Sequence, residues 1–237
     1  MAVIYEGAST TTNKEIVVLT TQDSRNPKTG NMLQVFYMLK DTDPNTAFKA
    51  ARNNLESEQA TVCGGCPHLV DGTCYVLWHQ APLSTWRRYK RGGHNKDRVN
   101  SYLPVRLGAA GNPNSAPFSV SFNLLKNSPS HTGYVHQWLT CDQEFKRITM
   151  ASCESKTEAK AAQKLGWRTA RVMEVGDTEL LPNEIICPAT QKRADGVTPK
   201  TDCATCGLCS GTEGRGTCSI VFPVHGKSKN KFRGDDQ

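Results

Sequence analysis

Short apolar runs alternate with polar, turn-forming stretches along this chain, and the pattern predicts a mixture of strands and helices. The run MLQVFYML at 32–39 has the length of a buried strand and lies between Gly30 and the polar residues 41–44. Residues 45–60 repeat apolar side chains at helical spacing after a Thr-Asp-Pro start, which predicts a helix. The preceding segment is rich in Thr and Asn, so we expect residues 1–30 to be irregular.

The second half of the chain has a more regular pattern. Ser155 is a favourable helix cap and Glu158 follows it at the capping-box spacing, which predicts a helix over 155–165 that stops at Gly166. The other predicted elements are strands at 102–108, 132–138, 147–152, 167–175, 183–189 and 218–226, and a helix at 115–126. Strands that alternate with helices in this way form parallel β–α–β units. About seven or eight strands favour an α/β fold with a small or incomplete (β/α) barrel-like parallel sheet, with a doubly wound open sheet as the alternative.

The chain has 237 residues, enough for one domain with a sizeable core. We predict an irregular segment at 1–30, a single α/β domain at 31–226 and a basic disordered tail at 227–237. An apolar run of about 18 residues is missing, so we expect no membrane span. The start has no pattern of an export signal, so we expect a cytoplasmic protein.

Ten cysteines are the most unusual feature of the composition. In a reducing compartment, grouped cysteines more often bind metal than form disulfides. We expect the three isolated ones, Cys141, Cys153 and Cys218, to be ordinary small buried residues. The other seven form two groups, which we call the three-cysteine group (Cys63, Cys66 and Cys74) and the four-cysteine group (Cys187, Cys203, Cys206 and Cys209).

The four-cysteine group can hold either an iron–sulfur cluster or a zinc ion. Cysteines at successive two-residue gaps, with a remote Cys187-Pro188 pair, are typical of an iron–sulfur cluster, whereas four thiolates also suit structural zinc. The three-cysteine group needs a fourth ligand. His68 or His79 would complete a Cys3His zinc site, and a ligand from outside the protein would suggest an iron–sulfur cluster with an open iron.

Polar residues at the predicted strand ends are the candidates for catalysis, because barrel enzymes carry their active sites at the carboxyl ends of the strands. The candidates are Arg106, His136, Arg171 and His225. The two arginines would bind an anionic substrate or cofactor group. A single histidine at a strand end is, however, more often structural than catalytic.

Residues 85–98 form a basic segment with a local charge of +5, within a chain whose net charge is +7. Cationic and aromatic side chains alternate there, and such a mixture can contact phosphates and stack on bases of a nucleic acid. The alternative is a solvated helix face with Trp86 packed inward. The candidate nucleic-acid contacts are Trp86, Arg87, Arg88, Tyr89, Lys90 and Arg91.

Several blocks of the sequence together resemble an uncharacterised, cysteine-rich family found in bacteriophage, plasmid and bacterial genomes. They cover most of the chain from Pro27 to Gly226 and are PKTGNMLQVFYML, VCGGCPHLVDGTCYV, PLSTWRRYKRG, PVRLGAAGNP, TGYVHQW, MASCES, KAAQKLGWRTARV, IICPAT and TDCATCGLCSG. A more distant resemblance, carried by a Cys-Pro…Cys-Tyr element, an Arg-led strand and a Gly-Tyr strand, points to a phage gene-product family with a radical-SAM-like barrel. The resemblance implies that both cysteine groups belong to a shared pattern. It also implies a phage or mobile-element origin, and hence the host cytoplasm, but it implies no reaction.

Two functional hypotheses follow. The first is a phage or mobile-element metal-binding protein, with an iron–sulfur cluster or zinc, that is a metalloenzyme with an anion site at the strand ends. The second is a zinc-stabilised nucleic-acid-binding protein that acts in phage or plasmid replication or regulation. The cysteine spacing is more specific than the basic segment, so the sequence favours metal binding, with the activity unassigned.

Overall fold

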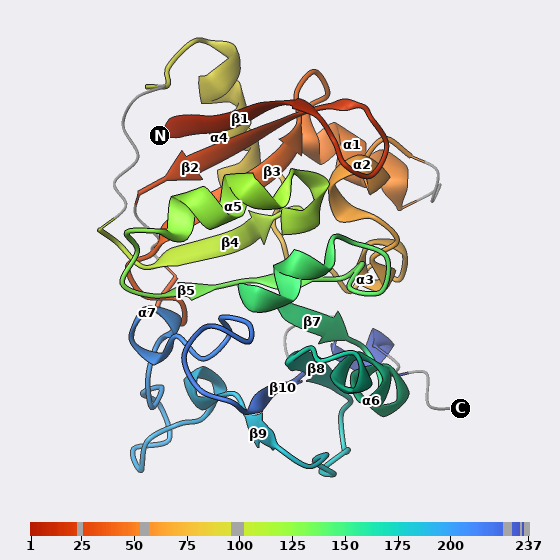
Figure 1. Ribbon diagram of the computed structural model, residues 1–237, viewed down its shortest axis with the longest axis vertical. Helices are drawn as coiled ribbons and strands as arrows, with labels where there is room; N and C mark the ends of the chain where they lie inside the picture. Colours follow the sequence, from red (N-terminus) through yellow and green to blue (C-terminus); the bar gives the residue numbers. More distant parts are fainter. Residues whose placement is uncertain (23–25, 53–56, 96–101, 225–228, 233, 235–237) are drawn as a thin grey trace.

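The computed structural model describes residues 1–22, 26–52, 57–95, 102–224, 229–232 and 234. Within them, the chain forms two open five-stranded sheets that follow one another along the sequence (Figure 1). The first sheet has the strand order β1-β2-β3-β4-β5, and the second has the order β6-β7-β8-β10-β9. The mixed α/β class and the parallel strands are therefore as predicted.

The first sheet begins with an antiparallel meander. It contains β1 (Ala2–Ala8), β2 (Glu15–Thr21), β3 (Leu33–Leu39), β4 (Val105–Ala110) and β5 (His131–Thr132), of which the last two run parallel to β3. The prediction that residues 1–30 are irregular is wrong, because β1 and β2 lie there. The four apolar residues 16–19 are fully buried on β2, and the Thr-rich stretch is only the turn between the two strands.

Helices cover both faces of the first sheet. On one face, Val35 and Tyr37 of β3 pack against α5 (Phe118–Leu125), and the Tyr37 hydroxyl hydrogen-bonds Ser121. On the other face, Phe36 and Met38 pack towards α1 (Pro44–Ala51) and α4 (Ala81–Lys90). Alternate residues of one strand thus serve two cores, which is why β3 is a continuous apolar run in the sequence.

The predicted helix at 45–60 is shorter in the structure. It begins at Pro44, where Asp43 accepts hydrogen bonds from the first-turn amides, and it ends at Ala51. Residues 53–56 lie outside the described residues, and α2 (Ala60–Cys63) follows. Two further short turns complete this region, α3 (Pro67–Val70) and the 3-10 turn η1 (Pro113–Ser115).

All strands of the second sheet are parallel to their neighbours. They are β6 (Tyr134–Val135), β7 (Met150–Cys153), β8 (Thr169–Met173), β9 (Glu184–Ile186) and β10 (Ser219–Pro223). One face packs on α6 (Lys156–Lys164), whose predicted cap is confirmed, since the Ser155 hydroxyl accepts from the Glu158 amide. The other face is covered by loops that contain η3 (Pro188–Thr190) and α7 (Cys203–Cys206).

The barrel prediction is wrong, because the described strands form two open sheets. The predicted strand at 132–138 is the point of failure. It divides at Gly133 into β5, which belongs to the first sheet, and β6, which begins the second, so the parallel strands never join one continuous ring.

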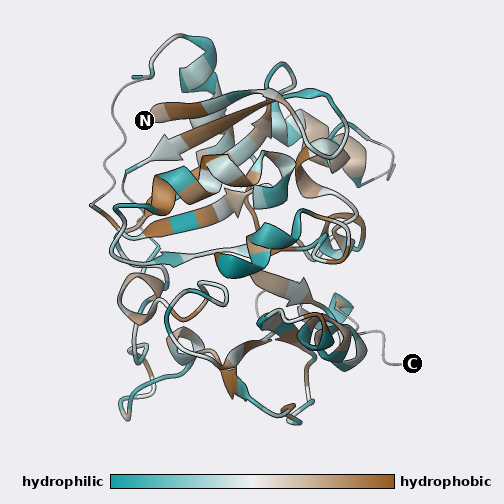
Figure 2. Ribbon diagram, viewed as in Figure 1, coloured by the Kyte–Doolittle hydropathy of each residue, from teal (hydrophilic) through white to brown (hydrophobic). Residues whose placement is uncertain are grey.

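Hydrophobic residues are concentrated on the strands, whereas α6 is largely hydrophilic on its outer side (Figure 2). In the described part of the chain, no helix is both long and apolar enough to cross a membrane.

Two further 3-10 turns are η2 (Gln143–Arg147) and η4 (Lys229–Lys231). The second belongs to the predicted tail at 227–237, and Phe232 beside it is buried against His68.

Candidate metal centres

The three-cysteine group is carried by a tight loop at the edge of the first sheet. Cys63 ends α2 and Cys66 precedes α3, and the Gly64 between them has a φ of 58°, in the left-handed region that favours glycine. A side chain at Gly64 would collide with Gln137, since an added Cβ would lie 1.9 Å from its Nε2. Gln137 in turn donates to the Cys63 carbonyl at 3.0 Å, so glycine allows this loop to dock on the segment that follows β6.

A histidine and a carboxylate reach the same loop from the second sheet. His136 directly follows β6 and Glu154 directly follows β7, so these parallel neighbours bring the two side chains together at their carboxyl ends. The His136 Nε2 lies 3.7 Å from the Cys66 Sγ, and its Nδ1 lies 3.5 Å from the Glu154 Oε1. Glu154 also approaches His68, with 3.4 Å between Oε1 and the His68 Nε2.

The electrostatics of this cluster are those of groups that share one buried site. Burial raises the pKa of Cys63 well above its ordinary value, and the charges of Cys66 and Cys74 raise it further. Burial alone would lower the pKa of His136, but contact with Cys66 and Glu154 outweighs it and raises that pKa. Burial also disfavours the charged form of Glu154, but the two neighbouring histidines outweigh it and hold the pKa of the carboxyl below its usual range.

The two histidines predicted as the fourth ligand are placed differently. His68 turns its Nδ1 to the Thr73 hydroxyl at 2.7 Å and its Nε2 to Glu154, and the Phe232 ring stacks on it. His79 is exposed in the turn before α4. The imidazole that reaches a cysteine of this group is His136, which the sequence singled out only as a catalytic candidate.

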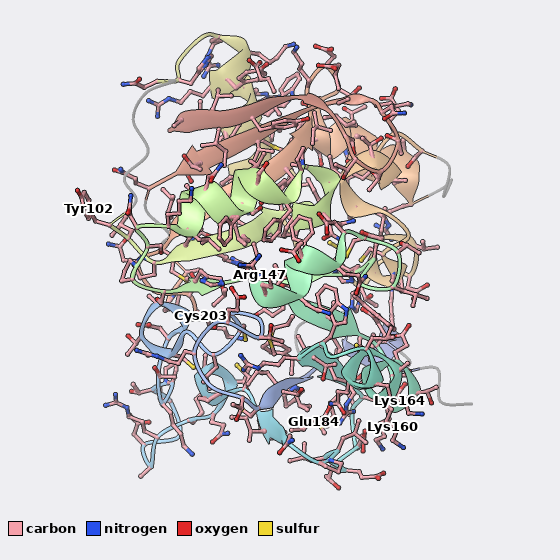
Figure 3. All side chains as sticks on the ribbon, viewed as in Figure 1. Tyr102, Arg147, Lys160, Lys164, Glu184 and Cys203 are labelled. Atoms are coloured by element: carbon pink, nitrogen blue, oxygen red, sulfur yellow. The ribbon has the colours of Figure 1, made fainter. Side chains whose placement is uncertain are left out.

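The four-cysteine group gathers on the far face of the second sheet. Cys187 directly follows β9, whereas Cys203 and Cys206 stand one helical turn apart on α7, which Asp202 caps. Gly207 then reverses the chain with a φ of 62° and returns Cys209 to the sheet, where its carbonyl accepts from the Gly133 amide at 2.9 Å. Figure 3 labels Cys203 where these loops meet the lower edge of the first sheet.

All the cysteines of this group line one small hollow, with Tyr134 and Ile220 as its floor. Its free volume of about 10 Å³ is close to that of one water molecule. Burial is the main cause that raises the pKa of Cys209 and of Cys187, and it raises the pKa of Cys203 to about 11. The charges of neighbouring cysteines also raise the pKa values of these three thiols.

As the side chains lie, no group of three or more His, Cys, Asp or Glu among the described residues is arranged to hold a metal ion. The cysteine groups belong to different clusters of buried residues, the first beside α1 and α3 and the second beneath β8 and β10. All ten cysteines are free thiols. Of the isolated ones, Cys153 is buried, whereas Cys141 and Cys218 are half-buried.

The remaining strand-end candidates do not converge on either cysteine group as a set. Arg171 is buried inside the second sheet and donates to both carboxylate oxygens of Glu184, at 2.9 and 2.7 Å, which commits its guanidinium to a structural ion pair. Arg106 lies near Cys203, where its charge opposes the rise in that thiol's pKa, and its Nη1 is 3.5 Å from Gln34. His225 lies outside the described residues.

The basic segment forms α4 and the turn after it. Its aromatic residues point inward: the Trp86 indole donates to the Leu39 carbonyl at 3.0 Å, and Tyr89 is buried with its hydroxyl on Glu6. Lys90 pairs with Asp41 at 3.1 Å. The exposed charges are Arg87, Arg88 and Arg91, while residues 96–98 fall outside the described part. This is the solvated helix face that the sequence offered as the alternative.

Sequence reasoning missed two residues that shape the three-cysteine site. Glu154 stands beside Cys153, and nothing in the local pattern marks it, because its partners come from another strand and another loop. Gln137 lies inside the predicted strand at 132–138, and nothing in the sequence marks it as part of a site. The available signal was their position, since both follow short parallel strands and such positions gather at one edge of a sheet.

Comparison with known proteins adds no relative to these observations. No family model, curated protein or solved structure matches the chain.

Proposed function

We propose that this protein binds metal at two thiolate-rich centres and that the ions hold its loops on the two sheets. The observation that carries the proposal is convergence: seven cysteines from three stretches of chain, 63–74, 187 and 203–209, gather in two places, each with its own polar partners. The neighbouring cysteines raise one another's pKa because two thiolates would repel, and a bound cation would offset that repulsion.

At the three-cysteine site, His136 completes a Cys3His set in place of the histidines nearest in sequence. Its Nε2 faces Cys66 while its Nδ1 faces Glu154, which is the arrangement of a metal-ligating histidine held by an outer carboxylate. A bound zinc ion would require the cysteine side chains to turn towards one point, with zinc–sulfur distances of ~2.3 Å. Cys63, Cys66, Cys74 and His136 are the proposed ligands.

At the four-cysteine site, the size of the hollow favours a single ion over a cluster. The hollow has room for about one water molecule, so a single ion fits it more readily than a cluster of several iron and sulfur atoms. Tetrahedral zinc bound by four thiolates is the closed type of site that stabilises a fold without doing chemistry. Zinc is therefore the proposed occupant, and an iron–sulfur cluster is the alternative.

The test is metal analysis of anaerobically purified protein, with a visible absorption spectrum. We expect about two zinc ions per chain and no visible band. Cys206→Ser and Cys66→Ser should each lower the zinc content by about one, whereas Cys141→Ser should leave it unchanged.

Other results of the metal analysis would change or overturn the proposal. A brown protein with iron and labile sulfide would replace zinc by a cluster at the four-cysteine site. Protein that is folded and free of metal after growth with added zinc and iron would overturn the proposal.

A second candidate function rests on the exposed arginines of α4. Among the described residues, Arg87, Arg88 and Arg91 make no ion pair, although the Arg88 Nε donates to the Gly93 carbonyl at 2.6 Å, so their charges are available to the phosphates of a nucleic acid. Binding to a labelled DNA or RNA duplex should then weaken steeply with salt and with Arg87→Gln/Arg88→Gln/Arg91→Gln. Salt-independent binding, or none, would remove this candidate.

A further inference from the structure

A cavity of about 380 Å³ opens beside the four-cysteine loops and has no part in either cysteine group's ligand set. Its walls are the end of α5, the segment 126–131, the end of η2 and the loop 207–215. Its volume falls in the ~300–1,000 Å³ range of small-molecule sites. Figure 3 labels Arg147 at its wall, between α5 and the loops that follow α7.

The charged groups around this cavity leave it positive. Arg147 is compensated, since its Nε donates to Glu213 at 2.8 Å and its Nη1 to Glu144. Lys126 and Arg215 also line the cavity, and neither makes an ion pair with any described residue. Arg147 and its two glutamates together carry a charge of −1, so with Lys126 and Arg215 the groups around this space carry a net charge of +1.

Each of these cations is held at its place by contacts that leave its charge available. The Arg215 guanidinium donates to the carbonyls of Thr205 and Cys206 at 2.9 and 3.3 Å, which anchors it on the cysteine loop. The Lys126 ammonium lies 6.0 Å from the centre of the Phe122 ring. Phe122 and Leu125 also supply an apolar wall beside the charges.

We propose that this cavity binds a small organic phosphate. A phosphate monoester carries a charge of about −1.5 to −2 at pH 7 and has three strong acceptor oxygens, so it can contact Lys126 and Arg215 at the same time. A lysine and an arginine are also the side chains that bind phosphate best, the first as a point charge and the second as a fork of donors. The organic part of the ligand would pack on the Phe122 and Leu125 wall.

The test measures the binding of glycerol 3-phosphate by isothermal titration calorimetry, with full-length, metal-loaded protein at constant ionic strength. We expect one site per chain, and glycerol should not bind. Lys126→Glu should weaken binding at least tenfold because it replaces attraction by repulsion. The matched control is Lys160→Glu, a charge reversal of the same size on the exposed face of α6 (Figure 3).

Circular dichroism and zinc content should be unchanged in both variants, which separates loss of the ligand site from loss of the fold. If the wild-type protein shows no binding at glycerol 3-phosphate concentrations up to about 10 mM, the proposal is wrong. Equal binding by wild type and Lys126→Glu would overturn it too, as would acetate binding as tightly as the phosphate. The metal proposal stands or falls separately, because the heat of phosphate binding is measured independently of the metal content.

Discussion

Single side chains explain why two arginines of this chain, one on a strand and one in a loop, have different roles. Arg171 was a candidate for anion binding, but its charge is neutralised within the sheet by Glu184, and both side chains are almost fully buried. Arg215, which no sequence pattern marked, keeps its charge because its guanidinium donates to neutral backbone carbonyls and makes no ion pair within the described part of the chain. Burial and the identity of the partner therefore decide whether an arginine is available for a ligand.

The Arg171–Glu184 pair gives a prediction about stability. Arg171→Met should cost about 3–5 kcal/mol of unfolding free energy, because it leaves the Glu184 carboxylate buried without its partner. The double variant Arg171→Met/Glu184→Met should recover much of that loss. Urea denaturation monitored by circular dichroism measures the unfolding free energy of each variant. If the double variant loses as much free energy as the two single variants together, the explanation is wrong.

Glu154 gives a prediction about metal affinity. Glu154→Gln keeps the size of the side chain but removes the charge that faces His136, so zinc at the three-cysteine site should bind roughly 10–100-fold more weakly. Competition with a chromogenic chelator measures the loss, and the visible bands of the cobalt-substituted protein report any change in ligand geometry. Glu58→Gln, on the surface beside Lys14, is the control and should change neither. If Glu154→Gln lowers thermal stability but leaves affinity and spectrum intact, the role of Glu154 is only structural.

At the scale of helices and strands, features that depend on the element's own residues could be predicted, whereas features that depend on distant partners could not. The strand β3 and the helix α6 could be predicted because their apolar runs and caps lie within the element itself. The hairpin of β1 and β2 was missed because a Thr-rich turn dominated the composition of that segment. The break at Gly133 could not be predicted either, since only the partner strands decide to which sheet β5 and β6 belong.

The same limit applies to the candidate centres. The spacing of Cys63 and Cys66 is local, so the sequence could predict that they act together. His136 and Glu154 come from the ends of two strands far along the chain, and only the pairing of β6 with β7 brings them to the loop. The sequence could therefore predict the cysteine sets but not the partner that completes one of them.

Two neighbouring glycines in the Cys-Gly-Gly-Cys turn give a prediction at this scale. Gly64→Ala should lower the zinc content by about one and reduce thermal stability, because the new methyl group would displace Gln137 and strain a left-handed backbone. Gly65→Ala is the matched control, since nothing lies within 4 Å of its added Cβ. Equal zinc content in the two variants would show that the docking of this turn does not position the ligands.

In the whole molecule, the two cysteine groups stabilise different amounts of structure. The loops of the four-cysteine group form one complete covering of the second sheet over Met150, Ala170 and Ile220. The three-cysteine group packs mainly with Ala51 and Leu69 at the border of the first sheet, which has helices on both faces. Loss of an ion should therefore matter more in the second sheet.

Thermal unfolding tests this difference. Cys203→Ser/Cys206→Ser should lower the Tm by several degrees more than Cys63→Ser/Cys66→Ser, because it releases loops that shield a sheet face from water. Differential scanning calorimetry at a fixed free zinc concentration provides the comparison. The reverse order would mean that the first loop, rather than the second, depends more on metal.

The single residue between the two sheets has a mechanical consequence. A side chain at Gly133 would come within 2.9 Å of Thr149 and 3.1 Å of Leu107, so the chain crosses from one half to the other through a space that Thr149 and Leu107 pack closely around. We therefore expect that unfolding of one half, by force or by heat, also disturbs the other half. We expect the two halves to come apart together, without a flexible joint about which they could swing.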